Sequence, residues 1–352
     1  HRSTVKNIMK TLQQFAESPP QSVPTTVAWS LSEVAEKKGR EELYTKQSPQ
    51  KLKVLREHAL IESAVSSNRI EGVEIERDRV RAVVLGKPLF RDRNEEEVRG
   101  YRNALDWIHS KAESRAVNEK TIRMLHQLCR GDIWDAGLFK EKDGDIIEKY
   151  PDGRMRVRFR PTAAVETPKA IEGLNNYWNI VSKNAEVPAL IAIAAYNLDF
   201  LCIHPFRDGN GRVSRLLLLL QLYHLTYGVG RYISIERLIE QNKDRYYETL
   251  ELSSEKWHEG HHNPWPYIGY VIYILKEAYC EFERRIGQLQ SPKGAKSEMV
   301  QRVVKRQQHD FRIVEIHNEC PGVSLDTVRK VLKNMRKKGE VRCLGRGQKA
   351  RW

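Results

Sequence analysis

Apolar residues recur at helical spacing along most of the chain. Residues 95–112 are the clearest case, because their apolar side chains are spaced to share one face of an amphipathic helix. The first 50 residues begin irregularly, since the prolines between 19 and 24 favour an extended segment. The pattern therefore predicts a mainly α-helical protein. Further helices are expected at residues 48–72, 76–85, 118–129, 168–181, 188–201, 213–227, 235–253 and 265–289.

Residues 140–162 have a different pattern. Apolar and polar residues alternate in RMRVRF, directly after an Asp-Gly pair at 152–153 that is a strong turn signal. We therefore expect a short β-hairpin between two helices. Its apolar side chains would be Ile146 and Ile147 on one strand and Met155, Val157 and Phe159 on the other.

The C-terminal end predicts a small second domain, which we place at residues 297–352. The segment SPKGAKS at 291–297 has the composition of a linker. Helices are expected at 311–319 and 325–338, with apolar residues inward and basic residues outward on the second. A two-stranded wing would follow around Gly345–Gly347. This order resembles a winged helix-turn-helix domain.

The charge is concentrated in the same region. The chain has a formal net charge of +14, and residues 293–352 hold about 16 basic and 6 acidic residues. A positive field at one end favours a polyanionic partner for that end. The second helix of a winged helix can enter the major groove of DNA, but many such domains bind protein, so the sequence leaves both partners open.

The sequence disfavours a membrane-spanning protein, and it disfavours a protein built on disulfides or on a cysteine metal site. The longest apolar stretch, at residues 216–222, is far shorter than the roughly 20 residues that span a bilayer. The five cysteines are scattered without a CxxC pair, which favours free thiols in a reducing compartment. With no signal peptide recognised, we expect a cytoplasmic protein without a membrane partner.

The candidate chemistry lies in IHPFRDGNGRVSRLL, residues 203–217. Its glycines allow positive φ, so successive amides can form an anion site at the start of the next helix. The positive charges of Arg212 and Arg215 are unfavourable near the positive N-terminal end of that helix, so an anion is expected beside them. Phosphate oxygens would supply the negative charge. Asp208 suits a divalent cation, and His204 can accept a proton from a hydroxyl. These groups suit transfer of a phosphorus-centred group from a nucleotide to a hydroxyl.

The string HPFRDGNGR resembles the Fic family motif, HPFx(D/E)GN(G/K)R, at every position. The segments AAYNLDFLCIHPFRDGNGRVSRLLLLL, AGLFKEKDGDII and RYYETL also resemble Fic segments, in the expected order. The resemblance covers roughly residues 50–285. It implies a helical Fic core, placed at 93–290, after an N-terminal helical region at 1–92. It also implies transfer of AMP from ATP, with Mg²⁺, to a hydroxyl of a target protein.

The resemblance also implies roles for individual residues. His204 would deprotonate the target Ser, Thr or Tyr hydroxyl, and Asp208 would hold Mg²⁺. Phe206 would be the buried anchor of the ATP-binding loop. The ATP phosphates would meet Gly209, Asn210, Gly211, Arg212 and Arg215.

Two further elements belong to the same resemblance. The hairpin would be a flap that aligns the target by strand addition through Met155, Val157 and Phe159. Tyr246 and Tyr247 fall where the family walls its nucleobase pocket. For these tyrosines, plain core packing is the alternative.

The segment SNRIEG at 67–72 resembles the family's inhibitory motif, (S/T)xxxE(G/N), in the branch where the inhibitory helix precedes the core. This implies that Glu71 pairs with Arg215, which should receive the γ-phosphate, while Ser67 reaches the loop and Gly72 ends the helix. Such a pair would hold the enzyme basally inactive. In some relatives the same glutamate supports removal of AMP, which leaves de-AMPylation open as a second activity.

Other whole-protein hypotheses stay open. One is a winged-helix DNA-binding regulator whose Fic domain senses nucleotide, although a sensor would not need His204. Another is transfer of UMP, GMP or phosphate. A phosphotransferase branch carries Lys at the position of Gly211, so the glycine favours nucleotidyl transfer. The sequence also leaves open whether the chain forms a homodimer.

Overall fold

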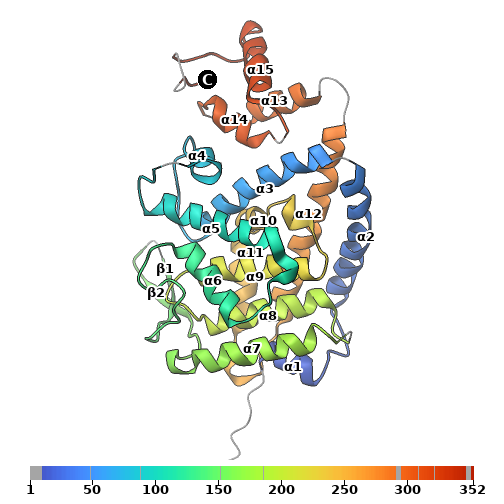
Figure 1. The fold of residues 1–352 in the computed structure, drawn as a ribbon, viewed down its shortest axis with the longest axis vertical. Coiled ribbons are helices and arrows are strands. Elements are labelled where there is room, and N and C mark those ends of the chain that lie inside the picture. Colours follow the sequence, from blue (N-terminus) through green and yellow to red (C-terminus); the bar gives the residue numbers. More distant parts are fainter. Residues whose placement is uncertain are drawn as a thin grey trace, which may run out of the picture.

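The computed structural model describes residues 10–47, 49–87, 89–150, 152–184, 186–290, 295–307, 309–320, 322–345 and 350–352. The fold is mainly helical and carries one small antiparallel hairpin (Figure 1). The predicted fold class of a mainly helical protein with a β-hairpin is thereby confirmed.

The elements follow one another along the chain in four groups. The first group is α1 (Thr11–Glu17), α2 (Thr25–Gln47), α3 (Pro49–Ile70), α4 (Val80–Leu85), α5 (Arg93–Lys111) and α6 (Glu119–Arg130). The hairpin consists of β1 (Ile146–Lys149) and β2 (Met155–Phe159). After it come α7 (Thr167–Val181), α8 (Ala189–Ile203), α9 (Asn210–His224), α10 (Ile235–Gln241), α11 (Lys243–Ser254) and α12 (Trp265–Gln290). The last group is α13 (Ala295–Arg306), α14 (Ile313–Glu319) and α15 (Leu325–Lys337).

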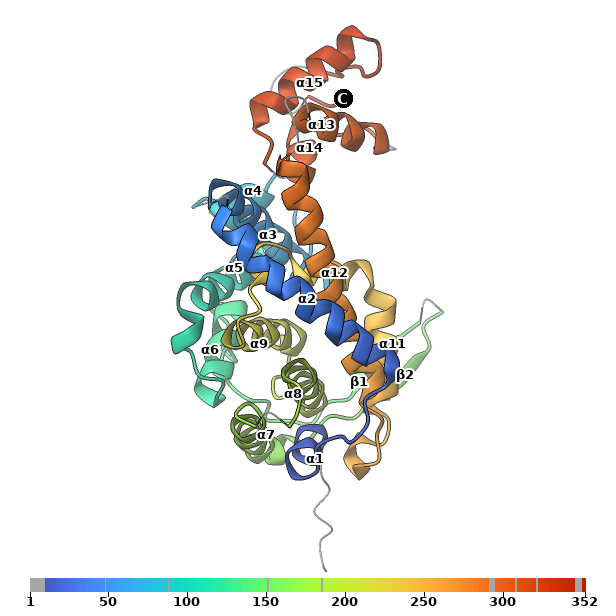
Figure 2. The same ribbon diagram turned by 90° about the vertical axis from the view of Figure 1, so that its right-hand side faces the viewer.

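The helices α8 and α9 form the centre of the larger hydrophobic core. Nearly every residue of both helices is buried, as their almost continuous apolar sequences require. They pack against each other, with α5, α6, α7 and α12 around them (Figures 1 and 2). Residues 204–209 connect the two helices, so the connecting loop is held at both ends by the best-buried part of the protein.

The sequence analysis missed α1 and α2. The start of α1 is held by a buried carboxylate, because Asp199 Oδ2 accepts from the amide of Leu12 at 2.8 Å and Oδ1 from the amide of Thr11 at 3.2 Å. α2 lies along α12, and its Val27 and Val34 enter the larger core. Both helices are stabilised by contacts with distant segments, which their own sequences do not reveal.

Helix boundaries differ from the predictions in two other places. The helix expected at 235–253 is broken at Asn242, whose side-chain amide donates to the carbonyl of Leu238 at 2.9 Å. The helix expected from Val213 starts at Asn210 instead, so Asn210 and Gly211 lie in its first turn. The glycine with positive φ is Gly209, directly before the helix.

The C-terminal helices have a hydrophobic core of their own. The sequence analysis missed α13, whose start at Ala295 takes up the end of the expected linker. Ser324 caps α15 by accepting from the amide of Thr327 at 3.2 Å. Antiparallel bridges join Arg312 to Arg351 and Leu344 to Arg351, while the tip of the expected wing, at 346–349, lies outside the described residues.

This C-terminal part contacts the rest of the chain through α14, the residue before it and described residues after it, up to Ser324. Arg312 Nη1 lies 2.5 Å from Asp78 Oδ2, and His58 of α3 hydrogen-bonds the backbone oxygen of Asn318. None of these contacts comes from α15. In Figures 1 and 2 the three helices sit beyond α3 and α4, at the end of α12.

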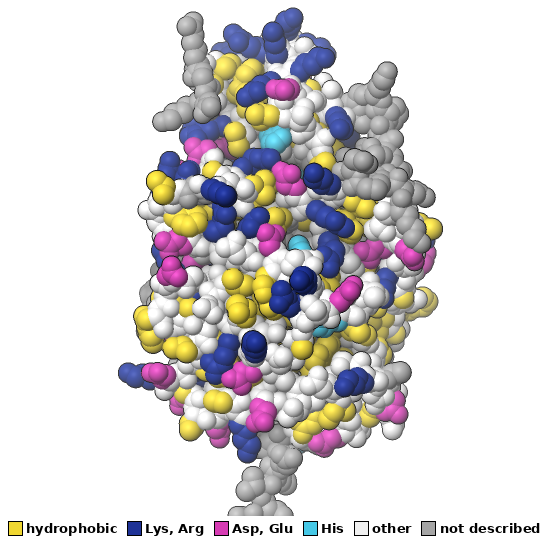
Figure 3. Space-filling view, in the orientation of Figure 1, with side chains coloured by type: hydrophobic (Ala, Val, Ile, Leu, Met, Phe, Trp, Pro, Cys, Tyr) yellow, Lys and Arg dark blue, Asp and Glu magenta, His cyan; other side chains and the backbone are white. Residues whose placement is uncertain are grey.

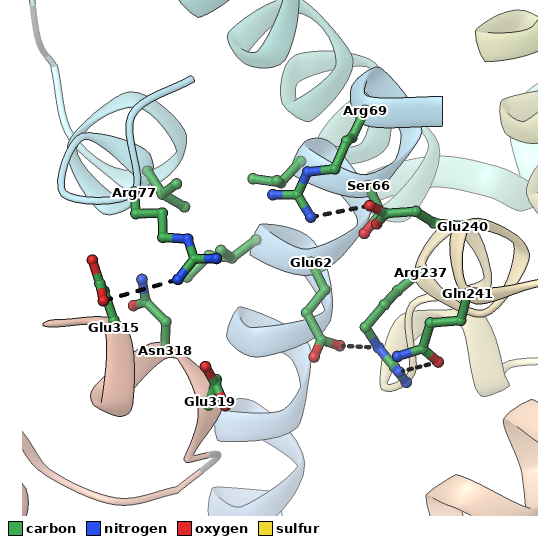
Figure 4. A pocket seen from close by; sticks show the side chains of 13 residues that line it. Glu62, Ser66, Arg69, Arg77, Arg237, Glu240, Gln241, Glu315, Asn318 and Glu319 are labelled. Atoms are coloured by element: carbon green, nitrogen blue, oxygen red, sulfur yellow. Dashed lines mark hydrogen bonds and ion pairs between the residues drawn. The ribbon is translucent and has the colours of Figure 1, made fainter. Parts of the chain in front are cut away.

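A cavity of about 430 Å³ lies at this junction, between α3, α10 and α14 (Figure 4). Most of its charged side chains pair with one another: Arg69 Nη1 lies 3.0 Å from Glu240 Oε1, and Arg237 Nε lies 3.3 Å from Glu62 Oε2. Because these charges already have partners, we interpret the cavity as a junction between two parts of the protein.

Candidate functional site

The loop between α8 and α9 has a fixed shape. His204 ends α8 with φ 52°, and Gly209 precedes α9 with φ 84°. Between them, Asn210 Oδ1 accepts from the amide of Phe206 at 2.9 Å, and Asn210 Nδ2 donates to the carbonyl of Phe206 at 2.8 Å. Phe206 is buried, as expected of an anchor. The side chain of Asn210 is therefore engaged within the loop.

His126 of α6 packs against the loop. The sequence analysis did not predict this residue. Its ring stacks on Phe206 with centroids 3.8 Å apart. Nδ1 accepts from the amide of Gly137 at 2.8 Å, so the ring proton is on Nε2, which donates to the carbonyl of Asp208 at 3.0 Å. Burial lowers the pKa of His126 to about 4, which keeps this neutral form at physiological pH.

A buried charge network lies behind the loop. Arg212 is only 1% exposed, and its Nη1 lies 2.6 Å from Glu97 Oε2 and 3.2 Å from Asn68 Oδ1. Glu97 Oε1 lies 2.9 Å from Nη1 of Arg130. Glu97, Arg130 and Asn68 were not among the predicted residues. A sequence signal exists for Arg130 and for His126: these two polar residues are four residues apart on the buried face of α6.

Asp208 connects this network to the solvent. Its Oδ2 lies 2.7 Å from Arg130 Nη1, yet the side chain is 56% exposed. Burial acts to raise the pKa of Asp208, but the guanidinium groups of Arg212 and Arg130 outweigh it and lower the pKa. The carboxylate is therefore ionised. Mg²⁺ is often held by one or two carboxylates together with substrate phosphates, and a single exposed carboxylate beside an anion site fits that mode.

His204 has the protonation state of a base. Its Nδ1 lies 3.3 Å from the carbonyl oxygen of Leu201, which can only accept, so Nδ1 carries the proton and Nε2 does not. Burial lowers the pKa of His204 to about 4, and the ammonium of Lys140 adds to the effect. Lys140 is itself fixed by donating to the carbonyl of Ile203 at 3.1 Å.

A cavity of about 260 Å³ opens beside His204. Gly211 lines it at the first turn of α9, where the amides lack intrahelical acceptors. Tyr246 and Tyr247 line another part. Tyr246 is also buried against Tyr267 and Tyr270, so it serves the core and the cavity wall together. The remaining lining comes from Glu71, Ile146, Arg158, Phe159, Leu201, Cys202, Leu250, Glu251 and Ser254.

The hairpin covers one side of this cavity. Ile147 pairs with Val157 in the antiparallel register, and both side chains are exposed, as is Met155. Phe159 instead points inward, with its ring 5.5 Å from that of His258. The hairpin therefore contributes Phe159 to the cavity and leaves an apolar face with Met155 and Val157 open to a partner.

The end of α3 reaches the cavity from the opposite side. Glu71 Oε1 lies 2.8 Å from Nη2 of Arg215, and Ser67 Oγ accepts from Nε of the same arginine at 2.9 Å. Gly72, with φ 81°, turns the chain away. A Cβ on Gly211 would collide with Glu71 Oε1, so the carboxylate lies directly against the first turn of α9. It occupies the place where an anion would bind.

Arg215 retains one free donor beside that place. The residue is buried, but its Nη1 has no hydrogen-bond partner within the described part of the chain. This atom would lie 3.2 Å from a Cβ on Gly211. A buried guanidinium with an unpaired N–H at a helix N-terminus is suited to a phosphate oxygen.

The sequence and fold were compared with known proteins. Residues 116–222 match the model of the Fic/DOC family. A Fic family protein from Desulfovibrio desulfuricans G20 has a similar structure, with a TM-score of 0.61 and 20% identity, covering 94% of this chain and 96% of that one. Fic-1 from C. elegans is similar with a TM-score of 0.58 and 18% identity over 80% and 81% of the two chains. At these identities the likeness shows a shared fold.

One curated relative is the ribonucleoside-diphosphate reductase small chain of Ostreid herpesvirus 1 (isolate France). It is 26% identical over 167 residues, which is 44% of this chain. The chain spans only 28% of the length of that relative, so the relative's activity is not carried over.

These comparisons show that residues 116–222 are similar to the Fic/DOC family and that the chain shares its fold with Fic-family structures. The family match includes the Fic loop from His204 to Arg215 and the supporting His126. Glu71, the tyrosine pair and the C-terminal helices lie outside the matched residues. Their roles therefore depend on the contacts described above.

The site brings some predicted residues together and not others. His204, Gly211, Tyr246, Tyr247, Phe159 and Glu71 share the cavity. Arg212 and Arg215 are buried beneath it, and Asp208 lies at the solvent-exposed edge of the charge network. No group of three or more possible metal ligands occurs among the described residues.

Two other sequence expectations can be compared with the structure. All five cysteines are free, and three of them are buried. Among the described residues, no helix is long and apolar enough to cross a membrane.

Proposed function

We propose that this Fic protein is a protein adenylyltransferase, which moves AMP from ATP to a Ser, Thr or Tyr hydroxyl of a target protein. The observation that carries the proposal is the cavity shared by His204, with its unprotonated Nε2, and the first turn of α9 at Gly211. A base for a hydroxyl and an anion site for a phosphate then face the same space, as nucleotidyl transfer requires.

The proposed step is an in-line displacement at the α-phosphorus. The target hydroxyl oxygen forms a bond to that phosphorus, and the bond from phosphorus to the bridging oxygen breaks, so that pyrophosphate leaves. The hydroxyl proton moves to Nε2 of His204. The amides at the start of α9 and the free N–H of Arg215 stabilise the phosphate oxygens.

Asp208 is the residue proposed to hold Mg²⁺, which would neutralise charge on the phosphates. The carboxylate is ionised and exposed, and Arg130 fixes its orientation. Tyr247, half-buried beside Arg158, and Tyr246 offer aromatic surface for the adenine ring.

The target chain is proposed to dock on the hairpin. A two-stranded sheet has unpaired edges, and an extended peptide can add to such an edge with main-chain hydrogen bonds. The exposed side chains of Met155 and Val157 would contact it, while Phe159 closes the cavity below.

We further propose that Glu71 holds the protein inactive. Its carboxylate lies where a phosphate would bind and takes one N–H group of Arg215. ATP must displace this carboxylate to reach a productive position. The same carboxylate beside the cavity is the reason to test removal of AMP as a second activity.

The proposal can be tested with labelled ATP and Mg²⁺. We expect Glu71→Gly to label itself far faster than the wild-type chain, because the anion site is vacated. Glu74→Gly, three residues further on at an exposed position, is the matched control and should label at the wild-type rate. Adding His204→Ala to Glu71→Gly should reduce labelling at least about hundredfold.

Three outcomes would count against this function. If both Glu71→Gly and the double variant bind ATP but neither transfers label, the Fic domain is a nucleotide sensor. Label from the γ-phosphate alone would indicate phosphotransfer. Faster transfer from UTP or GTP than from ATP would replace adenylylation with another nucleotidyl transfer.

A further inference from the structure

The helix α15 presents an exposed basic face. Its inward side is apolar, with Val328, Val331, Leu332 and Met335 buried. Within the described residues, only Arg329 of the outward cations has an ion pair, with Asp326 at 3.0 Å. The exposed cations on and directly after the helix are Arg329, Lys330, Lys333, Arg336, Lys337 and Lys338.

No described part of the chain covers this face. The C-terminal helices dock on α3 and α4 through α14, because His58 of α3 hydrogen-bonds the backbone oxygen of Asn318 and Nη1 of Arg81 on α4 lies 3.4 Å from His317 Nδ1. Figure 3 shows Lys and Arg gathered at the end of the molecule formed by the C-terminal helices. Closely spaced like charges destabilise one another unless an anion is near, so this face favours a polyanion.

The chemistry of the face selects among polyanions. It carries no large apolar side chain, whereas protein interfaces usually need a buried aromatic or aliphatic anchor and membrane-bound helices an apolar side. A helix of 13 residues is about 20 Å long and fits the major groove of B-DNA, which is about 12 Å wide. Arg351, which forms the bridge with Leu344, and Arg342, two residues before Leu344, are both exposed and could contact neighbouring phosphates.

We propose that the C-terminal helices α13–α15 bind duplex DNA, with α15 in the major groove. The cap at Ser324 fixes the start of the helix, so Thr327 and Lys330 lie in its first two turns, where base edges are usually contacted. The proposal is independent of the adenylyltransferase function, because it uses none of the residues around His204.

The test uses the full chain and a labelled 30-base-pair duplex of mixed sequence, followed by fluorescence anisotropy at 50 to 300 mM salt. We expect binding whose logarithm falls linearly with the logarithm of salt concentration. The triple variant Lys330→Glu, Lys333→Glu, Lys337→Glu should bind at least about tenfold more weakly at 50 mM salt, with a slope lower by about 2 to 3.

A second triple variant controls for net charge. Lys111→Glu, Lys120→Glu and Lys183→Glu change the same number of exposed lysines on the larger core and should leave duplex binding within about twofold. Thermal unfolding of both variants shows whether they fold. No binding at 50 mM salt, or an equal loss in the two folded variants, overturns the proposal. Equal affinity for a single strand of the same length also overturns it, because groove docking needs a duplex.

Discussion

The Fic loop and α15 place similar cations in opposite environments. Arg212 and Arg215 are buried under the loop and are held by Glu97, Asn68, Glu71 and Ser67. The basic side chains of α15 project into solvent, and most have no ion pair in the described part of the chain. A buried arginine with fixed partners can shape a small rigid anion site. An exposed row of cations can follow a long and regular polyanion.

Because the buried arginines and the exposed cations of α15 have different partners, mutations at the two places should change the free energy of unfolding by different amounts. A buried guanidinium that loses its carboxylate cannot be hydrated, whereas an exposed ammonium stays hydrated whether or not its neighbours change. Four predictions use that contrast, from the largest expected effect to the smallest.

Glu97→Ala should lower the free energy of unfolding by about 3–5 kcal/mol, because it leaves Arg212 and Arg130 buried without their shared carboxylate. Urea unfolding followed by circular dichroism measures the change. A loss below about 1 kcal/mol would mean that water reaches these guanidinium groups, and the contrast with α15 would fail.

Gly209→Ala should lower the free energy of unfolding by about 1–2 kcal/mol. The position has φ 84°, and a Cβ there would lie 3.3 Å from Arg130 Cδ. Gly144→Ala is the control, since a Cβ at that position meets nothing within 4 Å and φ is not positive. Equal losses at the two sites would show that the Fic loop does not require this backbone conformation.

The pH dependence should reflect burial at the Fic loop. The pKa of His204 is lowered from 6.5 to about 4, so the neutral base persists and the transfer rate of Glu71→Gly should change less than about twofold between pH 7.5 and 5.5. Because its folded pKa is below the unfolded one, His204 also stabilises the fold above pH 6.5, and this stability is lost as the pH falls towards 4.

Single-turnover rates over this pH range provide the measurement. A fall in rate centred near pH 6.5 would indicate an ordinary solvent-exposed histidine. The claim that burial lowers the pKa of His204 would then be wrong.

Lys330→Ala should change the free energy of unfolding by less than about 0.5 kcal/mol, since the side chain is exposed and has no ion pair among the described residues. The same urea titration as for Glu97→Ala gives the comparison directly. A loss above about 1 kcal/mol would show that α15 uses its basic face to stabilise the domain.

Local sequence signals predicted much of the fold. Val98, Tyr101, Ala104, Leu105 and Ile108 of α5 are all buried, as their spacing implied. The Asp-Gly pair led correctly to the hairpin, because both its turn and its strands are determined by adjacent residues. The loop motif and the resemblance likewise directed attention to His204 and to the contact between Glu71 and Arg215.

Local sequence signals could not predict that Glu97 and His126 hold the loop in place. Glu97 and His126 reach the loop from α5 and α6, about 80 to 110 residues earlier in the chain, and each looks like an ordinary polar residue in its own helix. α1 depends on the buried carboxylate of Asp199, which is equally remote. Local periodicity predicts which face of a helix is buried, but it does not predict which distant side chain meets a polar group there.

The central claim is that the carboxylate of Glu71, directly after α3, blocks a working nucleotide site at the start of α9. Intact-mass spectrometry of Glu71→Gly after incubation with Mg²⁺ and ATP tests it most directly. The account predicts a gain of one or more AMP units, absent from the wild-type chain under the same conditions. An unchanged mass in a folded Glu71→Gly that binds ATP, or an equal gain in both proteins, would contradict it.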